Sequence, residues 1–167
     1  MLMVALFSLH LLRNFPVKSA KSAGNPNKRQ AMELTHFPQD TLAMYVEASS
    51  FPEGVLAAHQ ALHAKIPYSD ERGYFGISWM EGDKIRYLAA AGELSADEPA
   101  EYGLPIFTIK KGSYICETVK GYMDDLSAIG RTFQQLLDDP RLDPQGYCLE
   151  VYDKNQRDMQ CLVKLKD

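Results

Sequence analysis

Alternating apolar and polar residues predict a strand, a helix and a hairpin in the first half of the chain. In TLAMYVEAS (41–49), every second residue from Leu42 onwards is apolar, which places these residues on one face of a β-strand. FPEGVLAAHQALHAKI (51–66) carries apolar residues at helical spacing, and Pro67 ends that pattern. The segment 73–92 has two alternating runs joined by EGDK, which predicts a β-hairpin.

A similar order of patterns follows about seventy residues later. PIFTIKKGSYICETV (105–119) predicts a strand with a bend at Gly112. The segment 122–139 has the spacing of an amphipathic helix, and 146–165 predicts a second hairpin. The recurrence of strand, helix, strand and strand indicates an internal repeat.

These patterns predict an α+β fold made by tandem duplication of a strand-helix-strand-strand unit. Repeat one covers about 40–95 and repeat two about 104–167. We expect antiparallel sheets with a helix on one side of each, related by a pseudo-two-fold axis. A ligand cleft is expected between the repeats, because small molecules bind preferentially at such junctions.

Superposition of the two hairpins predicts which side chains face this cleft. A shift of 73 residues aligns GYFGISW with GYCLEVY, so that Trp79 is matched to Tyr152. One face of both hairpins is then expected to point away from the helices, and the apolar residues on it favour a lined pocket over a solvent surface. That face would carry Phe75, Ile77, Trp79, Cys148, Glu150 and Tyr152.

Composition is that of an ordinary globular protein. The 167 residues are 46% apolar and 24% charged, with a net charge of -4, so a domain that coats nucleic acid is disfavoured. The acidic residues lie after the first 31, which hold five basic and no acidic side chains. The run MLMVALFSLHLL is too short to span a bilayer and lacks the leading basic region of an export signal. Residues 1–33 are therefore predicted to be a flexible or non-native extension.

The other candidate chemistry is sparse. His59 and His63 lie four residues apart, but no third ligand is evident, and two surface histidines are the favoured interpretation. Three cysteines without a CxxC pair indicate buried thiols in a reducing, cytoplasmic compartment. The KKGSY segment lacks the glycine spacing of a phosphate loop. We expect neither a metal nor a cofactor.

Glu150 is the most informative polar residue, because it interrupts an apolar strand. A partly desolvated carboxylate needs a cation or hydrogen bonds, and nearby aromatic rings also attract cations. The alternative is that Glu150 pairs with Lys164 or Arg157 at a wet sheet edge.

Two segments carry a resemblance to a known family. LEVY (149–152) and KKGSYICETVKGYMDDLSAI (110–129) resemble the GyrI-like, AraC-type bacterial effector-binding domains, over residues 34–167. The resemblance implies a domain that binds small molecules, with Glu150 as the anchor of the ligand. The repeat alignment, rather than a family motif, adds Tyr152, Trp79, Phe75, Ile77 and Cys148 around it, and Tyr114 could also reach the cleft. No DNA-binding domain precedes the module in this sequence, which argues against direct transcription regulation.

The expected function is therefore binding of a small amphipathic or cationic organic molecule by a stand-alone sensor, sequestering or regulatory module. One alternative is a hydrolase of reactive ring compounds, in which Glu150 and Tyr152 activate water. A second alternative is a protein-interaction module that resembles the gyrase inhibitors, with an unknown partner. Neither direct nucleic-acid binding nor membrane binding is expected.

Overall fold

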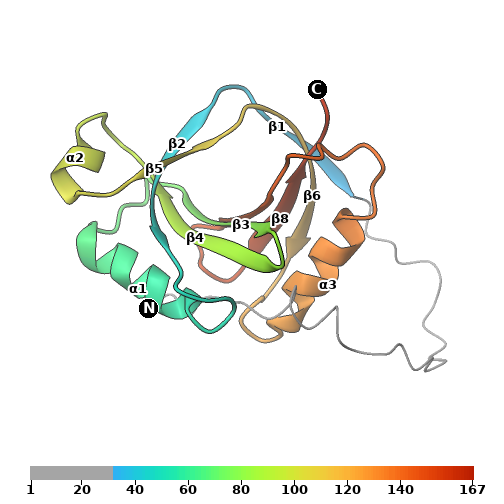
Figure 1. Ribbon diagram of the computed structural model, residues 1–167, viewed down its shortest axis with the longest axis horizontal. Coiled ribbons are helices and arrows are strands. Elements are labelled where there is room, and N and C mark those ends of the chain that lie inside the picture. The colour runs from blue at the N-terminus through green and yellow to red at the C-terminus, as the bar shows by residue number, and fades with distance from the viewer. Residues whose placement is uncertain (1–31) are drawn as a thin grey trace.

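The computed structural model describes residues 32–167. The predicted extension lies outside these residues except for Met32 and Glu33. Its main element is one antiparallel sheet of eight strands in the order β1-β6-β8-β7-β3-β4-β2-β5. The sheet is curled into a half-barrel (Figure 1). The strands are β1 Glu33–Phe37, β2 Thr41–Glu47, β3 Tyr74–Glu81, β4 Lys84–Gly92, β5 Ile106–Ile109, β6 Gly112–Val119, β7 Cys148–Tyr152 and β8 Met159–Lys164.

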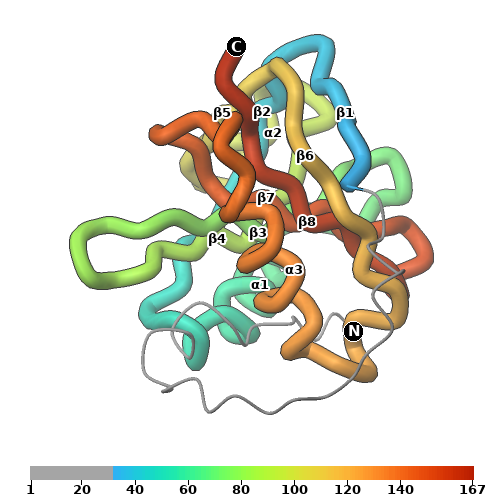
Figure 2. The backbone as a smooth tube through the Cα atoms, turned by 90° about the vertical axis from the view of Figure 1, so that its right-hand side faces the viewer, coloured from blue at the N-terminus to red at the C-terminus, as the bar shows by residue number. Residues whose placement is uncertain are grey.

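Three short helices accompany the sheet: α1 Val55–Lys65, α2 Glu98–Tyr102 and α3 Ser127–Leu136. Helix α1 packs on β4 and β2, whereas α3 packs on β6 and β8. Figure 2 shows both helices on the same side of the strands. We call this side of the sheet the helix-covered face and the concave opposite side the inner face. No helix in the described part of the chain is long and apolar enough to cross a membrane.

The predicted α+β class is wrong. The structure is mainly β and does not show a clear duplicated strand-helix unit. Two separate sheets were expected, but β3 pairs with β7 and joins both hairpins into one sheet. Local alternation identifies strands without specifying which distant strand each one pairs with. Strand β1 and helix α2 were not anticipated, because each has only five residues and so shows little periodicity.

Most of the local elements agree with the sequence patterns. The hairpin expected at 73–92 is β3 and β4, and the one expected at 146–165 is β7 and β8. The strand expected at 105–119 is divided into β5 and β6, with Gly112 at a φ of 127°. A side chain disfavours this φ, so glycine permits the break at that point.

Each face of the sheet has its own apolar core. The helix-covered face includes Tyr87, Cys148 and Tyr152, which pack with α1 and α3 residues such as Leu62 and Phe133. The inner face includes Phe75, Ile77, Tyr114 and Leu149, with Trp79, Phe107 and Tyr147 partly buried beside them. Successive residues of a strand alternate between these two cores.

Candidate functional site

The alternation in β7 places Glu150 on the helix-covered face. Cys148, Glu150 and Tyr152 all point to this side and are buried, and Glu150 is 3% exposed. Leu149 lies on the opposite, inner face and is fully buried as well. The central position of β7, between β8 and β3, accounts for burial from both sides. Glu150 is therefore a core residue rather than part of a wet edge.

Gly76 of β3 creates the space that the carboxylate occupies. It lies directly opposite Glu150 in the register of β3 and β7, and directly opposite residues share a face. A β-carbon at Gly76 would overlap the Tyr87 hydroxyl and the Oε2 atom of Glu150. Because the side chain is absent, Tyr87 can reach across β3 to the carboxylate.

Two phenols donate hydrogen bonds to the same carboxylate oxygen. The hydroxyl of Tyr152 lies 2.5 Å from Glu150 Oε2, and the hydroxyl of Tyr87 lies 3.0 Å from it. Nε2 of His59, on α1, lies 3.0 Å from the Tyr87 hydroxyl. We call Glu150, Tyr152, Tyr87 and His59 the carboxylate cluster.

Burial controls the ionisation of the carboxylate cluster. Desolvation raises the pKa of Glu150 to about 7, although the hydrogen bonds from Tyr152 and Tyr87 lower it. Desolvation also lowers the pKa of His59 to about 3, with a smaller contribution from His63. His59 is therefore neutral at physiological pH and can donate from Nε2 to Tyr87. The carboxyl of Glu150 exchanges its proton near neutrality.

The alternative pairing of Glu150 with a cationic side chain is not observed. Lys164 Nζ bonds Asp167 and the Leu165 carbonyl, and the partner of Glu150 across β8 is Cys161. Within residues 32–167, no Lys, Arg or His forms a salt bridge with Glu150. The charge of this carboxylate is thus balanced by phenol dipoles alone.

The structure divides the predicted site residues between the two faces. Glu150, Tyr152 and Cys148 lie together on the helix-covered face. The remaining predicted residues, Phe75, Ile77, Trp79 and Tyr114, belong to the inner-face core. The expectation that all six hairpin residues point away from the helices is therefore wrong. The 73-residue alignment matched Ile77 to Glu150, whereas Gly76 is the strand partner, and an error of one residue exchanges the faces.

Sequence reasoning missed Tyr87, Gly76 and His59. His59 was interpreted as a surface residue but is 1% exposed, because α1 turns it towards β4. One available signal was the run YLAAAG (87–92), in which Tyr87 alternates with small residues on a single face. The large Tyr87 ring shares a face of β4 with the small Ala89 and Ala91, and this pattern indicates that the ring leans over its small neighbours.

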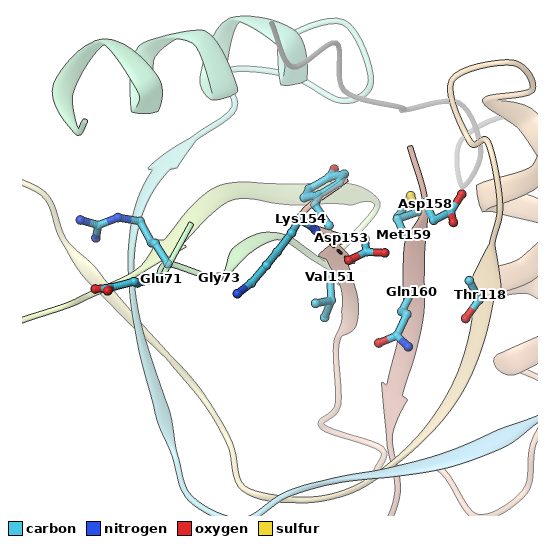
Figure 3. A pocket seen from close by; sticks show the side chains of 11 residues that line it. Glu71, Gly73, Thr118, Val151, Asp153, Lys154, Asp158, Met159 and Gln160 are labelled. Atoms are coloured by element: carbon cyan, nitrogen blue, oxygen red, sulfur yellow. Dashed lines mark hydrogen bonds between the residues drawn. The ribbon is translucent and has the colours of Figure 1, made fainter. Parts of the chain in front are cut away.

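A surface pocket of about 470 Å³ lies next to the carboxylate cluster (Figure 3). Tyr152 and Met159 belong to both the pocket wall and the helix-covered core. In Figure 3, Lys154 extends between Gly73 and Val151, while Asp153 and Asp158 lie farther along the rim. Glu150 itself is not among the lining residues of this pocket. Tyr152 therefore separates the buried carboxylate from a solvent-accessible cavity.

Comparison with solved structures shows that this fold is known, whereas no family model and no curated protein sequence matches the chain. Integron cassette protein VCH_CASS2 from Vibrio cholerae has a TM-score of 0.63 at 12% identity, covering 82% of this chain and 97% of that chain.

Two further structures have the same arrangement. SAV2435 bound to tetraphenylphosphonium gives a TM-score of 0.52 at 15% identity, covering 81% of this chain and 94% of that one. A transcription regulation protein from Staphylococcus aureus Mu50, described as putative in its name, gives 0.51 at 12% identity, covering 82% and 99%. These similarities concern the fold and are consistent with a GyrI-like effector-binding fold.

Proposed function

We propose that the chain binds a small amphipathic organic cation at the carboxylate cluster, as a sensor, sequestering or regulatory module of the GyrI-like type. The observation that carries the proposal is a carboxylate, 3% exposed, whose hydrogen-bond partners are the hydroxyls of Tyr87 and Tyr152. A buried carboxylate without a cationic partner is costly, and a bound cation would compensate it.

Aromatic rings around the cluster suit the same ligand. The Tyr152 ring lies 5.9 Å from that of Tyr122 and 5.7 Å from that of His59, and Phe51 lies 6.1 Å from Tyr87. The face of an aromatic ring attracts a desolvated cation by about 2 kcal/mol. A lipophilic cation would thus gain from the rings as well as from the carboxylate.

Access is proposed to occur from the pocket in Figure 3. Tyr152 lies between that pocket and Glu150, so rotation of its ring would open a path to the carboxylate. The pocket lining carries the acidic Glu71, Asp153 and Asp158 against the basic Arg72 and Lys154, and Arg72 is paired with Glu98. The excess of acidic side chains favours the approach of a cation. The fold shared with SAV2435, whose structure contains tetraphenylphosphonium, supports this ligand class.

The test is calorimetric titration of tetraphenylphosphonium into the wild type, Glu150→Gln and Glu117→Gln. Glu117 is a half-buried carboxylate of the same face, on β6, whose pKa is raised by desolvation. We expect Glu150→Gln to weaken binding about tenfold or more, the change expected when a buried charge pair is lost. Glu117→Gln should bind as the wild type does. Equal affinities of the wild type and Glu150→Gln would refute the proposal.

A hydrolase is the second candidate function. One oxygen of the Glu150 carboxylate accepts hydrogen bonds from two phenols, and desolvation raises the pKa of this carboxyl group to about 7. A base with this pKa can activate water near neutral pH. Turnover of a strained, electrophilic ring compound should then disappear in Glu150→Gln and fall strongly in Tyr152→Phe. If the wild type binds such a compound without turning it over, the hydrolase is refuted and only the binding function is supported.

A further inference from the structure

A second cavity, of about 770 Å³, opens at the other end of β3. The pocket in Figure 3 includes Gly73, just before β3, whereas this one includes Trp79 and Met80 near its end. Phe107 of β5 and Tyr147, just before β7, complete its aromatic lining. We call this cavity the aromatic end pocket. Its volume is in the range of small-molecule sites.

The curl of the sheet assembles the aromatic lining. Strands β3 and β5 are separated by β4 and β2 and would lie about 14 Å apart in a flat sheet. The rings of Trp79 and Phe107 are nevertheless 6.0 Å apart and nearly parallel, at 25°. Phe107 also contacts the Tyr147 ring edge-on, at 5.2 Å and 87°. The three rings therefore form a wall contributed by distant strands.

Hydrogen bonds hold this wall in position without using the ring faces. The Tyr147 hydroxyl accepts from the Lys110 backbone N–H at 2.9 Å and lies 3.1 Å from the Tyr114 hydroxyl. Tyr114 in turn donates to the Lys110 carbonyl at 2.6 Å. The polar end of Tyr147 is satisfied, and its ring is half-buried at the cavity. A preorganised ring costs little entropy when a ligand binds.

The charged side chains at this cavity already have partners. Lys110 pairs with Asp40 at 3.2 Å, and Asp143 accepts from the Gln145 N–H and lies 3.9 Å from Lys164. The Arg86 guanidinium covers Trp79 at 5.3 Å while pairing with Glu47 and Glu81. Met80 and Leu137 line the cavity with 45% and 42% of their surface exposed. The cavity thus offers apolar and aromatic surface, without an unpaired charge among its described lining residues.

We propose that the aromatic end pocket is a separate binding site for a neutral, planar aromatic molecule. Stacked and edge-on rings favour a flat aromatic partner, and the paired charges give no advantage to an ion. Its aromatic wall belongs to the inner-face core, whereas Leu142, Cys148 and Val163 of its lining belong to the helix-covered core. The pocket lies at the opposite end of β3 from the pocket beside Tyr152. It does not depend on Glu150, and its ligand differs in charge from the cation proposed there.

Trp79 is the single tryptophan of the chain, so it reports directly on this pocket. Titration with N-phenyl-1-naphthylamine, a neutral aromatic probe, should quench Trp79 emission in a saturable manner. We expect Phe107→Leu, which keeps apolar volume but removes the ring, to weaken the probe about tenfold. Phe37→Ala provides a matched control, since Phe37 packs against the same core from β1 but does not line the pocket.

The two proposed sites are distinguished by cross-testing the variants. Glu150→Gln should leave N-phenyl-1-naphthylamine binding within about twofold of the wild type, and Phe107→Leu should leave tetraphenylphosphonium binding equally unchanged. Circular dichroism and the unfolding midpoint would establish that each variant is folded. Absence of saturable quenching, or unchanged probe affinity in a folded Phe107→Leu variant, would overturn the aromatic end pocket. Loss of probe binding in Glu150→Gln would also overturn it.

Discussion

The two faces of β7 bury side chains of opposite character, one apolar and one ionisable. On the inner face, Leu149 is fully buried among apolar side chains. On the helix-covered face, its neighbour Glu150 is nearly as buried but carries an ionisable group held by two phenols. Burial of a leucine stabilises the fold, whereas burial of a carboxylate costs free energy unless a partner compensates it. One strand thus carries both a stabilising buried leucine and a buried group that titrates near neutrality.

The difference predicts which substitutions change the free energy of unfolding alone and which also change its dependence on pH. Substitutions on the inner face should alter the free energy of unfolding without changing its dependence on pH. Substitutions in the carboxylate cluster should alter the pH dependence and the affinity for cations. Four predictions test this division.

The largest effect is expected for Leu149→Ala. Removing a fully buried leucine leaves a cavity and costs about 2 to 5 kcal/mol in the free energy of unfolding. The loss should be similar at pH 5 and pH 8, because no titratable group is removed. Urea unfolding at both pH values measures it. A loss that depends strongly on pH would show that the two faces are not independent.

Glu150→Gln should remove a pH dependence of about 3 kcal/mol. The pKa of Glu150 rises from 4.5 to about 7 on folding, so the folded chain holds a proton that the unfolded chain releases. Wild-type stability associated with this group is complete below pH 4.5 and decreases as the pH rises through 7. The variant should therefore gain relative to the wild type between pH 4.5 and pH 8. A constant difference in unfolding free energy across this interval would contradict the raised pKa.

Gly76→Ala should destabilise the fold by about 1 to 3 kcal/mol, the usual cost of overpacking, and weaken cation binding. Its β-carbon would overlap the Tyr87 hydroxyl and the Glu150 carboxylate. Gly92→Ala is the matched control, since a β-carbon there meets its nearest atom at 3.8 Å. Thermal unfolding and tetraphenylphosphonium titration of both variants provide the comparison. Equal behaviour of the two would mean that Gly76 does not create the carboxylate site.

The smallest effect is expected for Tyr152→Phe. The lost hydroxyl donates to Glu150 at 2.5 Å and favours the ionised carboxylate, so its removal should raise the pKa of Glu150 by about one unit. Carbon NMR of labelled glutamate carboxyls would follow this titration. Tyr147→Phe, whose hydroxyl accepts from Lys110 on the inner face, should leave it unchanged. A lowered pKa of Glu150 in Tyr152→Phe would reverse the assigned role of the hydroxyl.

The sequence allowed most strands and both hairpins to be predicted, but not strand β1 or the pairing between distant strands. Alternation located β3 and β7 because each strand separates two apolar environments. The assignment of Trp79 and Glu150 to one face failed because it relied on aligned residues rather than on strand partners. Pairing depends on packing between segments far apart in sequence, which no local window contains.

Glu150 itself was identified from the sequence as an unusual residue, since a charge within an apolar strand requires an explanation. Its partner Tyr152 was identified as well, two residues along the same strand. Tyr87 and His59 were not identifiable, because Tyr87 reaches the carboxylate only across a glycine and His59 reaches the cluster from a helix. These contacts depend on side-chain direction in three dimensions. The ligand-binding role of the cluster remains a prediction.

The pairing of the edge strands also affects how the chain must fold. Strand β1 pairs with β6, and β5 pairs with β2. Glu33 is therefore paired with Cys116, from which it is separated in sequence by more than half of the described chain. Closing such distant contacts is entropically expensive and slows folding. During synthesis, β1 and β2 emerge well before β6 and β5 are available. We expect the nascent chain to leave these strand edges open to association with other chains, which makes early chaperone contact advantageous.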